Sequence, residues 1–138
     1  MFNTAIKFGT YPRNVQKAIG YLTLGWILHF VVYFGFLPGE ALARNDYLML
    51  VVGFVACYFV AGINNWARML SLFGNVIIFL NYLPLVLVLN KAGFGLQVLT
   101  TAVIVLFVLA TYYLLRKDTA DFFRSYDAAK AQNDAKKG

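Results

Sequence analysis

The fold is decided by the stretch Gly62-Ile63-Asn64-Asn65-Trp66-Ala67-Arg68, which is the strongly polar break in the middle of an otherwise apolar sequence. Two hydrophobic segments precede this stretch and two follow it. Such a pattern is typical of two helical hairpins joined by a short turn in a membrane. We therefore predict an all-α, polytopic membrane protein with four transmembrane helices arranged as two antiparallel hairpins.

Composition agrees with a membrane protein. The chain has 138 residues, of which 61% are hydrophobic and 13% charged, whereas a soluble domain carries roughly 25% charged residues. This length leaves room for about four spans of about 20 residues and short loops. The net charge of +6 does not indicate nucleic acid, because the basic residues are scattered among the apolar segments and form no stripe or arm. The expected partner is the lipid bilayer, and no nucleic-acid partner is predicted.

The apolar runs give the expected spans, which are 18–37, 47–63, 69–89 and 94–115. Together they make residues 1–117 a four-helix transmembrane bundle. At 1.5 Å per residue the second span is about 26 Å long, slightly shorter than a hydrocarbon core of about 30 Å. Pro84 removes a backbone donor from the third span and predicts a kink near Leu80.

A polar segment, 118–138, follows the bundle. It is expected to form a cytoplasmic amphipathic helix of about a dozen residues, with Phe122, Tyr126 and Ala129 at helical spacing and Phe123 beside them, and then a flexible tail. Two arrangements remain open for this helix. In the first arrangement the helix lies on the inner membrane surface, and in the second it continues the fourth span into water.

The distribution of basic residues sets the expected orientation. The N-terminal segment, the central turn and the C-terminal tail hold ten of the twelve Lys and Arg residues, and the two other loops hold only Arg44 and Lys91. Positively charged loops stay on the cytoplasmic side. Both termini are therefore predicted to be cytoplasmic.

The central turn, Gly62-x-Asn64-Asn65-Trp66-Ala67-Arg68, resembles the Gly-(basic or polar)-Asn-Trp-Ala-Arg turn of small bacterial four-helix inner-membrane proteins of uncharacterised function. Two further phrases are similar to those proteins: Tyr11-Pro12-Arg13-Asn14-Val15-x-x-Ala18 before the first span, and Leu114-Leu115-Arg116-Lys117-Asp118-x-x-x-Phe122-Phe123 after the last. The chain departs from the pattern at Ile63, where a basic residue is commoner. The resemblance implies the four-helix fold and a multi-pass location in the bacterial inner (cytoplasmic) membrane, and it implies no activity.

Ordinary membrane chemistry accounts for the turn. Trp66 is expected at the headgroup level, and Asn65 can cap the third helix. Arg68 can reach lipid phosphates, or a tail carboxylate such as Asp118 or Asp121. A partner-binding role for Arg68 is the alternative. The expected interfacial residues of the turn are Asn64, Asn65, Trp66 and Arg68.

Six intramembrane polar residues are the remaining candidates for function: His29, Asn75, Asn81, Gln97, Thr100 and Thr101. No Asp, Glu, Lys or Arg lies deep in any expected span, although proton-coupled transport and intramembrane acid-base catalysis usually rely on such a group. One His and one Cys cannot complete a tetrahedral zinc site. We therefore predict no catalytic residue, no metal site and no cofactor. His29 is expected to form an interhelical hydrogen bond, with Asn75 or Asn81 for instance.

Packing signals are clearer than chemical ones. Gly53, Cys57 and Ala61 follow one another at intervals of four residues, and such a stripe of small residues lets another helix approach closely. Aromatic residues crowd the first span more densely than an interfacial belt requires.

These observations favour a non-catalytic accessory or structural subunit of a bacterial inner-membrane assembly, or a homo-oligomeric membrane scaffold. Its partners would be other membrane subunits or further copies of itself. The alternative is a small oligomeric channel or transporter for a neutral or apolar molecule, lined by His29, the two intramembrane Asn residues and the Thr pair. A third interpretation is a membrane enzyme or a haem-associated subunit that uses His29 in a dimer, because a b-type haem needs two axial ligands.

Overall fold

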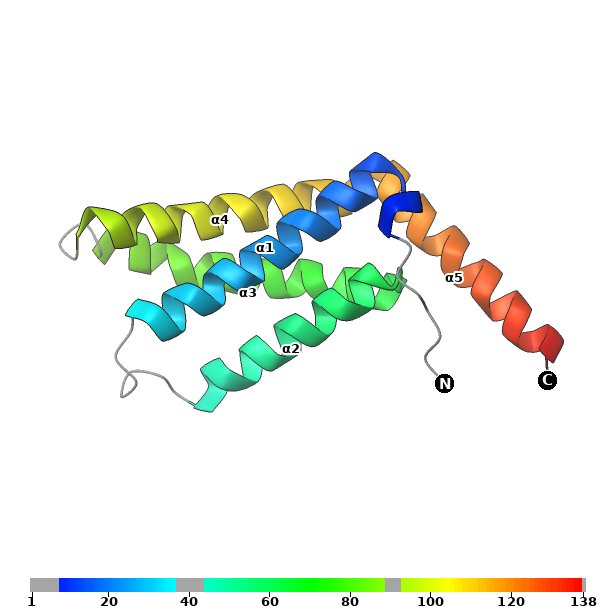
Figure 1. The fold of residues 1–138 in the computed structure, drawn as a ribbon, viewed down its shortest axis with the longest axis horizontal. Helices are drawn as coiled ribbons and strands as arrows, with labels where there is room; N and C mark the ends of the chain where they lie inside the picture. The colour runs from blue at the N-terminus through cyan, green and yellow to red at the C-terminus, as the bar shows by residue number, and fades with distance from the viewer. Residues whose placement is uncertain (1–7, 37–43, 89–92, 138) are drawn as a thin grey trace.

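The computed structural model describes residues 8–36, 44–88 and 93–137. Within these ranges the chain is all-α, with a short 3-10 turn followed by five helices (Figure 1). The elements are η1 (Phe8–Thr10), α1 (Arg13–Phe36), α2 (Arg44–Ala61), α3 (Asn65–Val88), α4 (Phe94–Leu115) and α5 (Lys117–Lys137). The expected loops, 38–46 and 90–93, lie outside the described residues except for 44–46, which are the first turn of α2 and not a loop, and Gly93.

The helices follow the predicted spans but begin earlier in three cases. Only α4 has the predicted bounds, whereas α1 and α3 begin at Arg13 and Asn65 and α2 covers 44–61. An apolar run marks the part of a helix suited to lipid, whereas backbone hydrogen bonding continues into polar residues. Thus the amide of Gln16 donates to the oxygen of Pro12 over 3.0 Å, and the amide of Arg68 to that of Asn64 over 3.1 Å. Helix α3 includes Pro84 and ends at Val88.

Among the described residues, three helical segments are long and apolar enough to cross a membrane: Arg13–Phe36, Asn65–Pro84 and Phe94–Leu115. The apolar part of α2, Tyr47–Ala61, is shorter. By length and composition these segments indicate a membrane protein.

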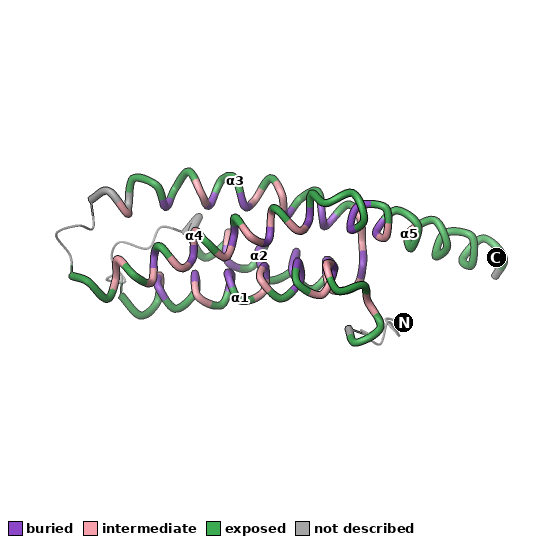
Figure 2. Tube along the Cα trace, turned by 90° about the horizontal axis from the view of Figure 1, so that it is seen from above, coloured by how far each residue is buried: buried purple, intermediate pink, exposed green. Residues whose placement is uncertain are grey.

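Helix α1 lies at the centre of the packing. Its Gly25 faces the ring of Phe107 on α4, and Trp26 meets the same ring edge to face with centroids 5.5 Å apart. On its other side, Trp26 packs so closely on Gly53 of α2 that a Cβ atom at position 53 would overlap the indole ring. Figure 2 shows the buried residues turned toward the middle of the bundle and the exposed ones turned outward.

The turn between α2 and α3 contains a strained residue. Ile63 has a φ of 55°, a left-handed conformation that is unfavourable for a β-branched side chain. The side chain is fully buried in the hydrophobic core. Burial of this side chain therefore offsets the strain of the backbone.

Helix α5 differs from the predicted tail helix. The helical conformation is interrupted at Arg116, where ψ is 138°. Helix α5 then packs its first turns against the end of the bundle. The residues buried there are Thr119, Ala120 and Phe123, so the buried face includes Phe123 but not the other predicted apolar residues, Phe122, Tyr126 and Ala129. The remainder of α5 projects away from the other helices (Figures 1 and 2).

The predicted flexible tail is helical as far as Lys137. Residues 128–137 consist largely of Ala, Lys and Gln, which are strong helix formers. This composition explains why α5 is longer than the predicted dozen residues.

Candidate functional site

A few polar side chains lie among the apolar residues of the core, and many large apolar side chains are exposed on the outer surface. The buried polar or charged residues are His29, Arg68, Ser71, Asn75, Thr100 and Thr119. Three of them, together with Tyr82, are spaced by three, four and seven residues along α3, so they share one face of that helix. This inward face of α3 therefore carries three of the six buried polar residues and the hydroxyl of Tyr82.

The most central polar contact joins α1 to α3. His29 Nδ1 lies 2.6 Å from the hydroxyl oxygen of Tyr82, and the tautomer of the imidazole decides which group donates. The expected interhelical hydrogen bond is present, but its partner is Tyr82, which neighbours the expected Asn81. Both side chains are almost fully buried. The contact therefore fixes how α1 and α3 face each other.

A cavity of about 170 Å³ adjoins this pair, and we call it the His29 cavity. Helices α1, α2 and α3 contribute its walls. Its lining residues are His29, Tyr33, Met49, Ile78, Asn81 and Tyr82. Asn81 itself is exposed, and its side-chain amide makes no hydrogen bond within the described residues. The structure thus brings two of the six predicted intramembrane polar residues, His29 and Asn81, to one cavity.

Asn75 lies elsewhere, between α3 and α4. Its Nδ2 donates to Thr111 Oγ1 over 2.9 Å, and the two residues line a groove of about 220 Å³ with apolar walls. Within the described residues, Asn75 Oδ1 and Ser71 Oγ are buried without a hydrogen-bond partner. The groove and the His29 cavity share no lining residue.

The predicted polar residues of α4 bond within their own helix. Thr100 Oγ1 donates to the carbonyl oxygen of Leu96 or Gln97, at 2.9 and 3.0 Å, and Thr101 Oγ1 donates to Gln97 at 2.8 Å. Hydroxyls of helical Thr commonly bond the preceding turn in this way. The structure therefore does not gather His29, both Asn residues and the Thr pair around one path.

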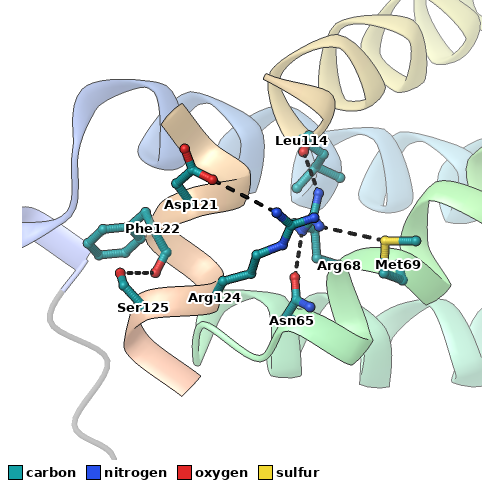
Figure 3. Close-up of polar contacts among 8 residues, drawn as sticks. All are labelled: Asn65, Arg68, Met69, Leu114, Asp121, Phe122, Arg124 and Ser125. Carbon is teal, nitrogen blue, oxygen red and sulfur yellow. Dashed lines mark hydrogen bonds and ion pairs between the residues drawn. The ribbon is translucent and has the colours of Figure 1, made fainter. Parts of the chain in front are cut away.

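Arg68 forms a second polar site, at the junction of α3, α4 and α5 (Figure 3). Only 4% of its surface is exposed. Its Nε donates to Asn65 Oδ1 and its Nη1 to the backbone oxygen of Leu114, each over 3.0 Å. Because the last carbonyls of α4 form the negative end of a helix dipole, they attract the guanidinium.

The partners predicted for Arg68 are engaged elsewhere. Asp118 accepts hydrogen bonds from Asn14 and from Arg116, and Asp121 lies 3.9 Å from Arg124. The hydrogen bond from Asn14 is the main cause that holds the pKa of Asp118 below its usual range. The predicted contact of Arg68 with a tail carboxylate is therefore wrong.

The capping prediction for α3 is also corrected. The backbone amide of Asn65 donates to Asp127 Oδ2 on α5 over 2.9 Å, so a carboxylate from α5 satisfies the first turn of α3. Asn64 uses its Nδ2 to bond the carbonyl of Phe59. Trp66 is exposed, as an interfacial ring requires. Sequence reasoning missed Asp127 because it follows the turn by more than sixty residues along the chain.

Comparison with known proteins adds no identification. No family model, curated protein or solved structure matches this chain. Its function is therefore inferred from the residues themselves.

The small-residue stripe of α2 is partly engaged within the chain. Gly53 packs on Trp26, Cys57 is buried, and Ala61 is half-buried. Among the described residues, no three His, Cys, Asp or Glu side chains are grouped so that they could hold a metal ion.

Aromatic rings continue from this packing onto the outer face of α1 and α2. Phe30 lies 4.6 Å from Phe34 and 6.3 Å from Phe54, and Phe34 lies 5.4 Å from Tyr47, between ring centroids. All four side chains are exposed. We call Phe30, Phe34, Tyr47 and Phe54 the aromatic ladder.

Proposed function

We propose that this chain is a non-catalytic accessory or structural subunit of a bacterial inner-membrane assembly, or a homo-oligomeric scaffold, that docks through the outer face of α1 and α2. The aromatic ladder is the observation that carries this proposal. Large rings supply contact area at little cost in conformational entropy, and they are enriched at protein interfaces. Four exposed rings in contact across two helices form a preorganised surface of this kind.

The proposal includes four membrane spans in two antiparallel hairpins. Helix α2 is the span whose assignment needs further argument, because its apolar part is short. Its 18 residues amount to about 27 Å of helix, and Tyr11, just before α1, donates to the carbonyl oxygen of Ala61 at the end of α2. The beginning of α1 and the end of α2 therefore lie at the same level. If α1 crosses the bilayer, α2 crosses it in the opposite direction.

We also propose that both termini are cytoplasmic. The contacts of Asn14 with Asp118 and of Asn65 with Asp127 bring α5 to the same end of the bundle as the start of α1 and the central turn. This end carries most of the basic residues, including Arg13, Lys17 and Arg116. The positive-inside rule assigns such an end to the cytoplasm, and the resemblance of the central turn supports a bacterial inner membrane.

A non-catalytic role agrees with the interior chemistry. His29 and Arg68 are engaged with Tyr82 and Leu114, and no Asp or Glu is among the buried residues of the described chain. A haem shared by two copies of His29 gains little support, because this side chain is only 4% exposed and packs against the rings of Trp26 and Tyr82. A continuous path for a neutral molecule gains little support either, because the cavity and the groove are lined by separate residues.

The test is native mass spectrometry of the protein extracted in polymer nanodiscs from its own membrane. The expected particle is heavier than the monomer of 15.5 kDa. The double variant Phe30→Ala/Phe34→Ala should release the monomer, because it removes two rings of the aromatic ladder. The matched control is Phe73→Ala/Leu80→Ala, which removes two exposed side chains of α3 and should leave the particle intact.

Two results would contradict the proposal. One is a wild-type protein that is already monomeric. The other is a particle that survives the ladder substitutions and is lost with the control.

A further inference from the structure

We propose that the His29 cavity binds a small uncharged ring compound that carries a hydroxyl group, such as a phenol. This inference does not depend on the docking role of α1 and α2. It rests on the size, the polarity and the ring geometry of the cavity.

Size comes first. The cavity holds about 170 Å³, whereas a water molecule occupies about 30 Å³ in the liquid and an engineered cavity of about 150 Å³ binds benzene. One aromatic ring therefore fits. Met49 forms the wall contributed by α2, and its flexible thioether side chain can adapt to the outline of a ligand.

Polarity argues against a purely hydrocarbon occupant. Cavities that stay empty are apolar, whereas four of the six lining residues here carry a polar group: His29, Tyr33, Asn81 and Tyr82. None of the six is charged. A charged ligand would lose its hydration without gaining a counter-charge, so the cavity selects a neutral molecule.

Ring geometry supplies the shape preference. The rings of His29 and Tyr33 lie 4.5 Å apart, those of His29 and Tyr82 5.4 Å, and those of Tyr33 and Tyr82 6.4 Å, between centroids. These separations are within the range of favourable aromatic contacts. Three mutually adjacent rings thus provide faces and edges against which a fourth ring can pack.

Asn81 supplies the hydrogen-bonding group. Its exposed amide, which makes no hydrogen bond within the described residues, offers both a donor and an acceptor where it lines the cavity. A hydroxyl can donate to the amide oxygen and accept from the amide nitrogen. The hydroxyl of Tyr82, held by His29, is a second partner inside the cavity.

The test measures binding of 4-fluorophenol to the full-length protein in nanodiscs by fluorine NMR, with fluorobenzene as the matched probe that lacks the hydroxyl. We expect saturable binding of 4-fluorophenol and binding of fluorobenzene that is about tenfold weaker, as expected for one or two lost hydrogen bonds. Asn81→Leu should weaken binding of 4-fluorophenol about three- to tenfold. Tyr82→Phe should act in the same direction, because it keeps the ring and removes the hydroxyl.

The control variant is Thr101→Val, which removes an exposed hydroxyl of α4 that bonds its own helix and should bind like the wild type. Competition by 4-octylphenol would assign the ligand to a membrane lipid with a phenolic head, and its failure to compete would assign it to a free phenol. Absence of saturable binding would overturn the proposal. Equal binding of the two fluorinated probes, or binding unchanged in both Asn81→Leu and Tyr82→Phe, would overturn it as well.

Discussion

Arg68 Nη1 donates a hydrogen bond to the backbone oxygen of Leu114 over 3.0 Å, and this contact joins the first turn of α3 to the last turn of α4. The same guanidinium donates to the side-chain oxygen of Asn65. The backbone amide of Asn65 in turn donates to the carboxylate of Asp127 on α5. Three helix ends therefore meet around one buried side chain. The arginine of the central turn acts as a structural clamp.

Replacing this clamp should destabilise the bundle. Arg68→Met keeps much of the side-chain length but leaves the carbonyl of Leu114 and the amide oxygen of Asn65 unpaired in a buried site. The expected cost is about 1–3 kcal/mol of unfolding free energy, measured by thermal unfolding in detergent. Arg124→Met is the control, because the Arg124 side chain is 67% exposed. Equal stability of the two variants would mean that the clamp contributes nothing.

Gly53 should not tolerate even one additional methyl group. A Cβ at this position would overlap the ring of Trp26, so Gly53→Ala should force α1 and α2 apart and cost about 1–3 kcal/mol. The same substitution at Gly74, where no atom lies within 4 Å of the added Cβ, should be neutral or stabilising, because Ala is the better helix former. The comparison is made by thermal unfolding. A Gly53→Ala variant as stable as Gly74→Ala would refute this packing.

At position 63 a Gly variant should be more stable than an Ala variant, which is the reverse of the usual order inside helices. Both substitutions lose the buried side chain, but only Gly adopts a φ of 55° without strain. Ile63→Gly should therefore be about 1 kcal/mol more stable than Ile63→Ala, since the left-handed conformation costs a residue with a Cβ about 1–2 kcal/mol. In the interior of α2, Ala56→Gly should show the normal order and lower stability. A Gly variant of position 63 that is less stable than the Ala variant would contradict the strained turn.

Asp118 should make the docking of α5 sensitive to acid. Its pKa is lowered in the folded protein, chiefly by the hydrogen bond from Asn14. The contact therefore stabilises the protein above the unfolded pKa, and this contribution is lost as the pH falls through the folded pKa, below about pH 4. Asn14→Ala should raise the pKa of Asp118, as followed by carbon NMR of its carboxyl group. Gln16→Ala, which removes bonds to the carbonyls of Gly9 and Tyr11, should leave that titration in place; a shift equal to that in Asn14→Ala would refute the assignment.

The helices could be predicted from sequence because their signals are local. Apolar runs and the polar break at 62–68 indicate where helices lie and where they end, and the bounds of α4 were predicted correctly. The small-residue spacing of α2 also indicated a close approach, which the structure places between Gly53 and Trp26. Periodicity does not reveal which helix provides the neighbour.

The partners of the polar residues could not be predicted, because they depend on how distant helices are rotated against each other. Tyr82 looks in the sequence like one more aromatic core residue. Nothing in the sequence therefore indicated that it, and not Asn75 or Asn81, is the partner of His29. Likewise, Asp127 reaches Asn65 only because the break at Arg116 turns α5 toward the central turn. A one-residue change of helical phase would alter each of these pairs.

The four-span bundle with cytoplasmic termini is tested most directly by reporter fusions made in bacterial cells. Green fluorescent protein should fluoresce when fused after Asn64 and after Gly138, and alkaline phosphatase should be active when fused after Ala43 and after Ala92. The fusion after Asn64 decides whether the short α2 crosses the membrane. Phosphatase activity at Asn64, on the same side as Ala43, would show that α2 does not span the bilayer and would contradict the account.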